Sequence, residues 1–227
     1  MTKAVAVIPT KSNFAGLLNI VKILEANNSI HTTVVVADGE TTYNLLERSL
    51  SRYDKIDLRC VPLGSGIHVM WNLGLELATK LNLHAIFIND DVSSNLDTAS
   101  ILCESLDKHS ELRLVCPNYD NRQIGGAYQS VTTTCGGRYD GTGGLAGFYM
   151  ALHKDLVPDF RFNEKMKWYY GDDDILMWVL SRGYKAAILS FTFCWGNESK
   201  TISVDPPKNF EEDIKKDKLI YKETWSL

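Results

Sequence analysis

Cysteine is scarce in this chain, and no two cysteines form a CxxC pair. An odd number of widely spaced cysteines argues against a disulfide framework and against the paired ligands of a zinc site. Such a pattern is typical of free thiols in a reducing compartment. We therefore expect a cytoplasmic location, without disulfides or structural zinc. The five cysteines are Cys60, Cys103, Cys116, Cys135 and Cys194.

Long hydrophobic runs and an excess of positive charge are also missing. No stretch approaches the roughly 20 apolar residues of a transmembrane helix, and the apolar part of the N-terminus is too short for a secretory signal. We expect no integral membrane association. The net charge of −4 provides no general attraction to nucleic acid, although a local basic groove remains possible. Oligomeric state is not visible in the sequence.

The first half of the chain alternates between strand-like and helix-like segments. This alternation predicts an α/β fold with a mainly parallel sheet flanked by helices. In open sheets of this kind, ligands bind beyond the carboxyl ends of the strands, and Asp38, the loop 64–66 and the pair Asp90-Asp91 all follow such ends. The expected strands are 4–9, 32–37, 57–63 and 85–88, and the expected helices are 14–24 and 68–81.

The second half is less regular. A polar, glycine-rich segment at 118–144 shows little periodicity, and loops of this length are usually functional. No repeat or linker is visible, so residues 1–227 are expected to form a single domain. The expected elements here are helices at 96–109 and 172–182, strands at 112–116, 145–152 and 186–194, and a terminal amphipathic helix marked by Phe210, Ile214, Tyr221 and Trp225.

The most informative motif is Asn89-Asp90-Asp91, at the exit of an apolar strand. Two adjacent carboxylates beside a buried strand are costly unless their charge is used. Divalent cations such as Mg2+ or Mn2+ take oxygen ligands and commonly combine one or two carboxylates with substrate phosphates. The alternative is a helix N-cap, in which Asp91 or the serines after it would start the following helix. Capping would explain one carboxylate but not the pair.

With these segments in order, the chain resembles the GT-A glycosyltransferases, particularly glycosyltransferase family 2. The resemblance spans nearly the whole sequence and implies a Rossmann-like fold. Residues 1–117 would form the nucleotide-sugar-binding half and residues 118–227 the acceptor and catalytic half. The motifs that carry it are Ala-Val-Ile-Pro9-Thr10, Val-Val-Val-Ala-Asp38-Gly, Trp71-Asn72-Leu-Gly74, Phe-Ile-Asn89-Asp90-Asp91, Gly144-Leu-Ala-Gly147, Gly171-Asp172-Asp173-Asp174, Arg182-Gly183-Tyr184 and the ending Asp217…Tyr221…Trp225.

The resemblance also implies roles for the first half of the site. Asp91 would ligate Mn2+ or Mg2+, and Asp90 would support it or contact the donor sugar. Asp38 would accept a hydrogen bond from the nucleotide base, although a turn at Asp38-Gly39 is the plainer explanation. Asn72 would face the nucleotide or simply be solvated. The remaining residues expected to line this nucleotide-sugar cleft are Pro9, Thr10, Gly64, Ser65, Asn89 and Gly144.

The second acidic cluster, Asp172-Asp173-Asp174, lies at the start of an expected helix. Acidic residues suit a first helical turn through the helix dipole, so one or two of the three are expected to do only that. By the resemblance, Asp172 matches the aspartate of the family's ED motif, with Gly171 in place of the glutamate. It would be the general base for the acceptor proton, and Asp173 is the alternative. Repulsion between the carboxylates should raise at least one pKa.

The aromatic residues before this cluster could bind an acceptor. The positions of the histidines, in contrast, do not match the pattern of the family. Trp168 and Tyr169 could stack on sugar rings, or they could belong to the core. Many GT-A enzymes carry a late histidine that completes the metal site; here Asn197, Glu198 or a water molecule would have to take its place. The histidines show no ligand spacing and are expected at the surface or at caps: His31, His68, His84, His109 and His153.

The resemblance therefore implies a metal-dependent glycosyltransferase that acts with inversion. The donor would be a UDP-, GDP- or dTDP-linked sugar, and the hydroxyl acceptor a glycan, a small molecule, a protein or modified DNA, with the segment 118–144 as its loop or lid. A sugar nucleotidyltransferase is one rival, but residues 9–13 lack its glycine-rich, basic signature. A non-catalytic nucleotide- or glycan-binding module is the other, and it would tolerate loss of Asp172–Asp174.

Overall fold

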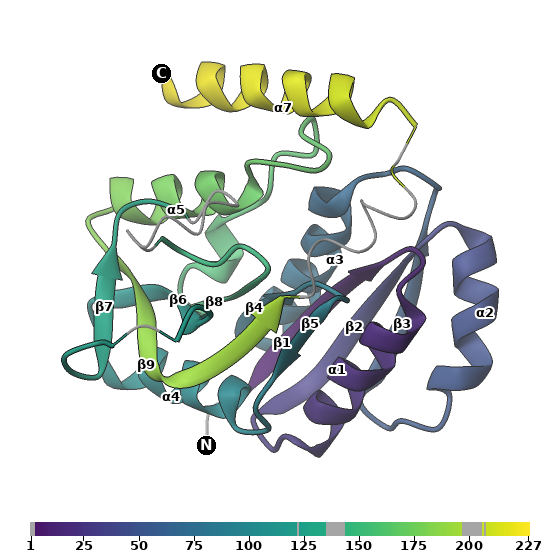
Figure 1. Ribbon diagram of the computed structural model, residues 1–227, viewed down its shortest axis with the longest axis horizontal. Helices are drawn as coiled ribbons and strands as arrows, with labels where there is room; N and C mark the ends of the chain where they lie inside the picture. The colour runs from purple at the N-terminus through teal and green to yellow at the C-terminus, as the bar shows by residue number, and fades with distance from the viewer. Residues whose placement is uncertain (1–2, 122, 135–143, 197–205, 207) are drawn as a thin grey trace.

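A computed structural model shows an α/β architecture in which helices cover both faces of a continuous sheet (Figure 1). It describes residues 3–121, 123–134, 144–196, 206 and 208–227. The strands are β1 (Ala4–Thr10), β2 (Ile30–Asp38), β3 (Ile56–Val61), β4 (His84–Ile88), β5 (Val92–Ser94), β6 (Leu112–Asn118), β7 (Tyr128–Val131), β8 (Tyr149–Leu152) and β9 (Lys185–Gly196). The helices are α1 (Phe14–Ala26), α2 (Glu40–Leu50), α3 (Ile67–Leu81), α4 (Thr98–Lys108), α5 (Gly171–Ser181) and α7 (Phe210–Trp225), with a 3-10 turn at Val157–Asp159.

The sheet has the strand order β3-β2-β1-β4-β8-β6-β9-β5, with β7 also paired to β9. The strands β3, β2, β1 and β4 are parallel, as the alternation of strands and helices predicts. Antiparallel partners then enter on the β4 side, because β8 pairs with β4 and β6, while β5 and β7 pair with β9. The carboxyl ends of β1, β2, β3 and β4 therefore share one edge, and the second half of the chain continues the same sheet.

Alternation along β1 divides the core into two layers. Ala4, Ala6 and Ile8 pack with α1, α2 and α4 on one face, whereas Val5 and Val7 pack with α3 and α5 on the other. Helix α3 comes very close to the sheet, since a Cβ on Gly74 would lie 2.5 Å from the Cβ of Val7. A larger residue there would displace α3, and with it the loop that precedes the helix.

The structure corrects the expected elements in three places. Helix α2 was not expected, because its buried side is narrow and rests mainly on Leu46 and Leu50. The short strand β5, directly before the expected helix 96–109, was not expected. The helix itself begins two residues later than expected, at Thr98. The segment 118–144, which was expected to be a loop, contains β7, and this strand pairs antiparallel with β9. Residues 122 and 135–143 lie outside the described part.

The terminal helix α7 is confirmed, and it runs along the top of the molecule in Figure 1, beyond α5. Its ring of Phe210 lies 5.9 Å from the ring of Tyr169, and Tyr221 stacks on Tyr170 at 5.2 Å. Among the described helices, none is long and apolar enough to cross a bilayer. The four described cysteines are free thiols, as expected; Cys135 lies outside the described residues.

Candidate active site

The first part of the site forms where β1 and β4 end side by side. These strands are parallel neighbours in register, which brings Thr10 to Asp90. The hydroxyl of Thr10 donates to Oδ2 of Asp90 at 2.7 Å, and both side chains are buried. Asn13 donates to the backbone carbonyl of Asp90 at 3.0 Å. Pro9 is buried within β1, so it supports the position of Thr10 and does not itself line the described cavities.

The neighbouring Asp91 is not a helix cap. It is followed directly by β5, and α4 begins only at Thr98, with Asp97 as its N-cap residue. Asp91 is nevertheless only 8% exposed. Beside it, Oδ1 of Asn89 is buried and has no hydrogen-bond partner among the described residues. Such a buried, unsatisfied oxygen is unusual. Together with the two carboxylates it makes an oxygen-rich donor set of the kind that hard divalent cations prefer.

Asp38 joins the ends of β2 and β3. Its Oδ1 accepts from the backbone N–H of Gly64 at 2.7 Å, so its side chain reaches across to the loop after β3 and does not simply close its own turn. Burial raises the pKa of Asp38, although hydrogen bonds from the backbone of Gly64 and Ser65 and the charge of Lys11 act in the opposite direction. A carboxylate held in this way is an oriented acceptor at the rim of a cavity.

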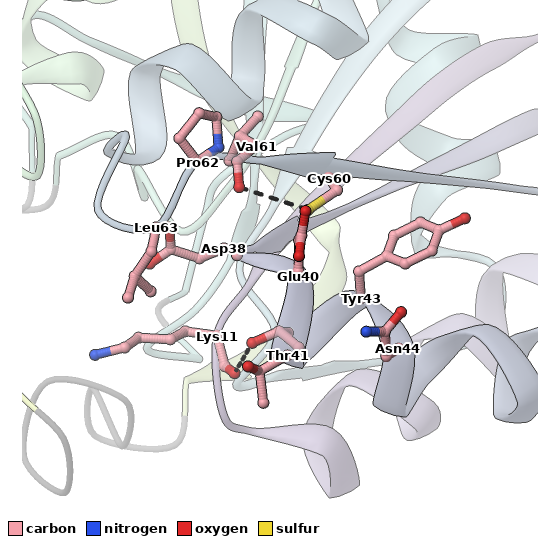
Figure 2. A pocket seen from close by; sticks show the side chains of 12 residues that line it. Lys11, Asp38, Glu40, Thr41, Tyr43, Asn44, Cys60, Val61, Pro62 and Leu63 are labelled. Atoms are coloured by element: carbon pink, nitrogen blue, oxygen red, sulfur yellow. Dashed lines mark hydrogen bonds between the residues drawn. The ribbon is translucent and has the colours of Figure 1, made fainter.

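Two adjoining cavities open beside Asp38. The first has a volume of 1010 Å3 and lies between the ends of β2 and β3 and the start of α2 (Figure 2). The second has a volume of 640 Å3 and is closed on its far side by Trp168 and the start of α7. Lys11, Asp38 and Leu63 line both. Lys167 and Lys208 also line the second cavity. Asp38 and Asp213 line it too, and Nζ of Lys167 lies 3.3 Å from Oδ2 of Asp213, so three cationic side chains and two carboxylates surround one hollow. The excess of cationic side chains suits an anionic ligand.

The second acidic cluster opens α5, and its three carboxylates have different surroundings. Asp173 accepts from the hydroxyl of Thr134 at 2.6 Å, and Asp174 accepts from the indole N–H of Trp225 at 2.8 Å. Asp172 instead lies against Gly147, where a Cβ would stand 2.4 Å from Oδ2 of Asp172. Burial, followed by the charge of Asp173, raises the pKa of Asp172 to about 7. Of the three, Asp172 is therefore best suited to exchange a proton near neutral pH.

The glycine at position 171, where the resemblance leads one to expect a glutamate, is required by its packing. A Cβ at this position would lie 2.3 Å from Nε2 of His68 and 3.0 Å from the ring of Trp71. His68 is fully buried, and its Nδ1 donates to the carbonyl of Met166 at 2.6 Å. Burial lowers the pKa of His68, so the ring is neutral. The imidazole of His68 thus occupies the space that a side chain at position 171 would need.

The segment 167–170 leads into the second acidic cluster and is held by α7 and by the start of α3. The buried carboxylate of Asp217 accepts from the backbone N–H groups of Lys167, Trp168 and Tyr169, at 2.9, 2.8 and 3.0 Å. On its other side, the carbonyl of Lys167 accepts from the N–H of Ile67 at 2.7 Å, at the start of α3. Trp168 lines the second cavity, whereas Tyr169 is 42% exposed. Spacing alone did not reveal the role of Asp217, although it shares one helical face with Tyr221 and Trp225.

Four expected cleft residues make hydrogen bonds within the protein. The amide of Asn72 is buried and exchanges hydrogen bonds with the backbone of Phe162, so we assign it to packing and not to the nucleotide. The hydroxyl of Ser65 donates to the carbonyl of Pro62 at 2.6 Å and shapes the loop. The N–H of Gly64 donates to Asp38 and that of Ser65 to the carbonyl of Pro62, so neither of these two amides is free for a phosphate. Gly144 is buried, and its N–H donates to the hydroxyl of Tyr119 at 3.4 Å.

A separate cluster lies at the other end of β4. Potential ligand atoms of His84, Asp107 and His153 lie within 4.8 Å of one another. However, Nδ1 of His84 accepts from the N–H of Lys154, and Nδ1 of His153 from that of Asp155. The ring protons therefore occupy Nε2, the nitrogens that a metal would need bare. We interpret this cluster as a hydrogen-bonded core group. The expectation of surface histidines is wrong for His68, His84 and His153, which are buried.

Known proteins resemble this chain in structure but not detectably in sequence. No protein-family model matches it, and no curated protein does. TarS from S. aureus (residues 1–349), solved with UDP-GlcNAc, superposes with a TM-score of 0.61 at 15% identity, over 94% of this chain and 64% of that one. The mannosyltransferase PcManGT from Pyrobaculum calidifontis, solved with GDP-Man and Mn2+, superposes with a TM-score of 0.62 at 14% identity, over 85% and 56%.

This chain thus spans less than two thirds of the length of either structure. Identities this low establish the fold alone. Thr10, Asp38 and Asp90 lie together at the carboxyl edge of the sheet, and this arrangement and the strand order agree with the superpositions. The chain has the GT-A glycosyltransferase fold.

Proposed function

We propose that this protein is a metal-dependent glycosyltransferase that moves a sugar from a nucleotide donor to a hydroxyl acceptor. The observation that carries the proposal is the short connection between the two acidic clusters. The N–H of Asn89 donates to the carbonyl of Phe148 at 2.9 Å, and the adjacent Gly147 lies against the carboxylate of Asp172. The clusters are therefore close enough to act on the two sides of one reacting bond.

The donor would lie along the edge formed by β1, β2, β3 and β4. Asp38 is an oriented acceptor for an N–H of the base, and the adjoining cavities have room for a nucleoside diphosphate sugar. Lys11, Lys167 and Lys208 supply positive charge on the same side. The structural neighbours solved with UDP-GlcNAc and GDP-Man support this class of donor without selecting the base.

The residues at the end of β4 fit a divalent cation. Asp91 would hold Mn2+ or Mg2+, with Asn89 and Asp90 as further oxygen donors, because Oδ1 of Asn89 is buried without a partner and Thr10 fixes the Asp90 carboxylate. When bound, such an ion supplies Lewis-acid assistance to departure of the diphosphate. The residues expected to replace a late histidine, Asn197 and Glu198, lie outside the described part of the chain.

Asp172 would take the proton of the acceptor hydroxyl on its carboxylate. As the acceptor oxygen forms its bond to the anomeric carbon, the bond from that carbon to the diphosphate oxygen breaks, and the configuration inverts. A pKa of about 7 leaves Asp172 partly ionised at neutral pH while keeping it a competent base. The hydrogen bond from Thr134 makes Asp173 the weaker candidate. The free, scattered cysteines favour a cytoplasmic site for this reaction.

The test is donor turnover. Wild type and Asp91→Ala would be incubated with UDP-, GDP- and dTDP-sugars and Mn2+, and the release of nucleoside diphosphate measured. We expect wild type to cleave one donor class and Asp91→Ala to lose at least 100-fold. Release of pyrophosphate from a nucleoside triphosphate and a sugar phosphate would instead identify a nucleotidyltransferase. If wild type binds and cleaves no donor, the proposal is wrong.

A further inference from the structure

A smaller cavity lies on the acceptor side of the carboxylates, away from the hollow at Asp38. It has a volume of 290 Å3 and forms where β6 ends beside the last residues of β9. We call it the β6–β9 cavity. This volume is at the lower limit of ligand sites, which are typically about 300–1,000 Å3, so it suits one ring of a ligand. Its lining residues are Asn118, Tyr119, Asn121, Phe193, Cys194 and Trp195.

The lining combines aromatic rings with amides. Trp195 is 54% exposed, so its ring is accessible to a ligand in the cavity. Asn121 is exposed as well, and its amide offers both donors and an acceptor. An aromatic face contacts the C–H groups of a pyranose, while amides serve its hydroxyls. This combination is therefore suited to a sugar ring.

The cavity adjoins both acidic clusters. Trp195 pairs with Ser93 across β5 and β9, and Ser93 follows Asp91 by two positions. On the other side, the ring of Tyr119 meets the ring of Phe148 edge-on at 5.8 Å. Phe148 is next in sequence to Gly147, which lies against Asp172. A ring in this cavity would therefore lie within reach of the base and of the expected metal ligand.

Charge distinguishes this cavity from the donor side. None of its described lining residues is lysine or arginine, whereas Lys11, Lys167 and Lys208 surround the second cavity at Asp38. Nucleic-acid sites rely on cationic side chains to neutralise phosphates. The absence of cations among the lining residues thus favours a neutral ligand over a nucleotide or DNA.

We propose that the β6–β9 cavity binds a sugar ring of the acceptor, so that the acceptor is a glycan or glycoside. This inference rests on the proposed function. Trp195 is the stacking platform, and Asn121 binds hydroxyl groups of the ring. The acceptor residues expected from the sequence do not line this cavity: Trp168 lines the second cavity at Asp38, and Tyr169 lines neither.

The experiment is direct sugar binding, measured by saturation-transfer NMR. The probes are methyl glycosides and disaccharides of glucose, galactose, mannose and N-acetylglucosamine, each with and without UDP or GDP. The variants are Trp195→Ala and, as a matched control, Phe191→Ala, because Phe191 is 73% exposed on the same strand but does not line the cavity. We expect saturation transfer to at least one sugar in wild type and in Phe191→Ala, and a loss of at least fivefold in Trp195→Ala.

Three outcomes would overturn the inference: no sugar in the panel binds wild type, Trp195→Ala binds as well as wild type, or a short oligonucleotide displaces the bound sugar. The outcome is separable from that of the proposed function. Donor cleavage without acceptor depends on the carboxylates, so it is measured in wild type and in the control Phe191→Ala, which should agree within twofold. Failure of donor cleavage in wild type would refute the transferase, whereas absence of sugar binding in a wild type that still cleaves its donor would refute only this site.

Discussion

The carboxylate of Asp172 rests directly on Gly147, so close that a Cβ at position 147 would stand 2.4 Å from Oδ2. The glycine is therefore required by a side chain from a distant helix and not by its own backbone angles. Replacement by even the smallest side chain must move the carboxylate.

We predict that Gly147→Ala lowers transfer activity at least 100-fold, because a base displaced by about 1 Å loses its alignment. Gly125→Ala is the matched control, since nothing lies within 4 Å of a Cβ there. Steady-state kinetics and thermal unfolding of both variants would separate a local effect from a loss of fold. Equal activity of the two variants would argue against Asp172 as the base.

A second prediction concerns pH. With a pKa of about 7, Asp172 becomes protonated as the pH falls below neutrality, so activity should decline on the acidic side of pH 7. The charge of Asp173 contributes to the raised pKa. Asp173→Asn should therefore shift the acidic limb of the kcat profile to lower pH. An unchanged limb in Asp173→Asn would mean that another group controls it.

The same pKa has a consequence for stability. The folded-state pKa of Asp172 is higher than that of an unfolded aspartate, so the native state loses stability as the pH rises from about 4 to about 7. Asp172→Asn removes this penalty. We expect the variant to be more stable than wild type at pH 8 by about 1–2 kcal/mol, less than the full shift because the carboxylate is partly exposed. Urea unfolding should show the difference vanishing toward pH 4.

A third change tests the close packing of His68 against Gly171. Gly171→Ala places a Cβ 2.3 Å from Nε2 of a fully buried ring, which should destabilise the fold by about 1–3 kcal/mol. His68→Ala should cost a similar amount through the cavity that it leaves. Because each change relieves the other, the double variant should be more stable than the sum of the single effects predicts. Strict additivity in chemical denaturation would contradict the contact.

A fourth change concerns Asp217. Asp217→Asn removes the charge that accepts three backbone N–H groups, and we expect a loss of about 2–3 kcal/mol in stability. Because the segment 167–170 lies between the donor cavity and Asp172, donor KM and kcat should both worsen. Glu212→Gln, on an exposed position of the same helix, is the control and should change neither. A normal donor KM in Asp217→Asn would show that α7 does not position the site.

The sequence predicts the parallel half of this fold well, because strands such as Ala4–Thr10 are continuous apolar runs and their helices are regular. It predicts the position of the first acidic cluster for the same reason, since Asn89-Asp90-Asp91 follows such a strand, whereas Asp172–Asp174 open a helix. It does not reveal β5 or β7, whose few residues carry no distinctive pattern and depend on pairing with β9. Nor does it reveal the contact of Gly147 with Asp172, because packing between distant segments has no local signature.

Helix α7 is synthesised after every segment that it fastens. The carboxylate of Asp217 accepts hydrogen bonds from the backbone shortly before Asp172, and the indole N–H of Trp225 donates to Asp174. While the chain is still being translated, the sheet and the carboxyl edge can already be complete, yet the acidic turn of α5 lacks its last restraints. If the proposed transfer depends on this turn, activity would begin only once residue 225 has emerged from the ribosome.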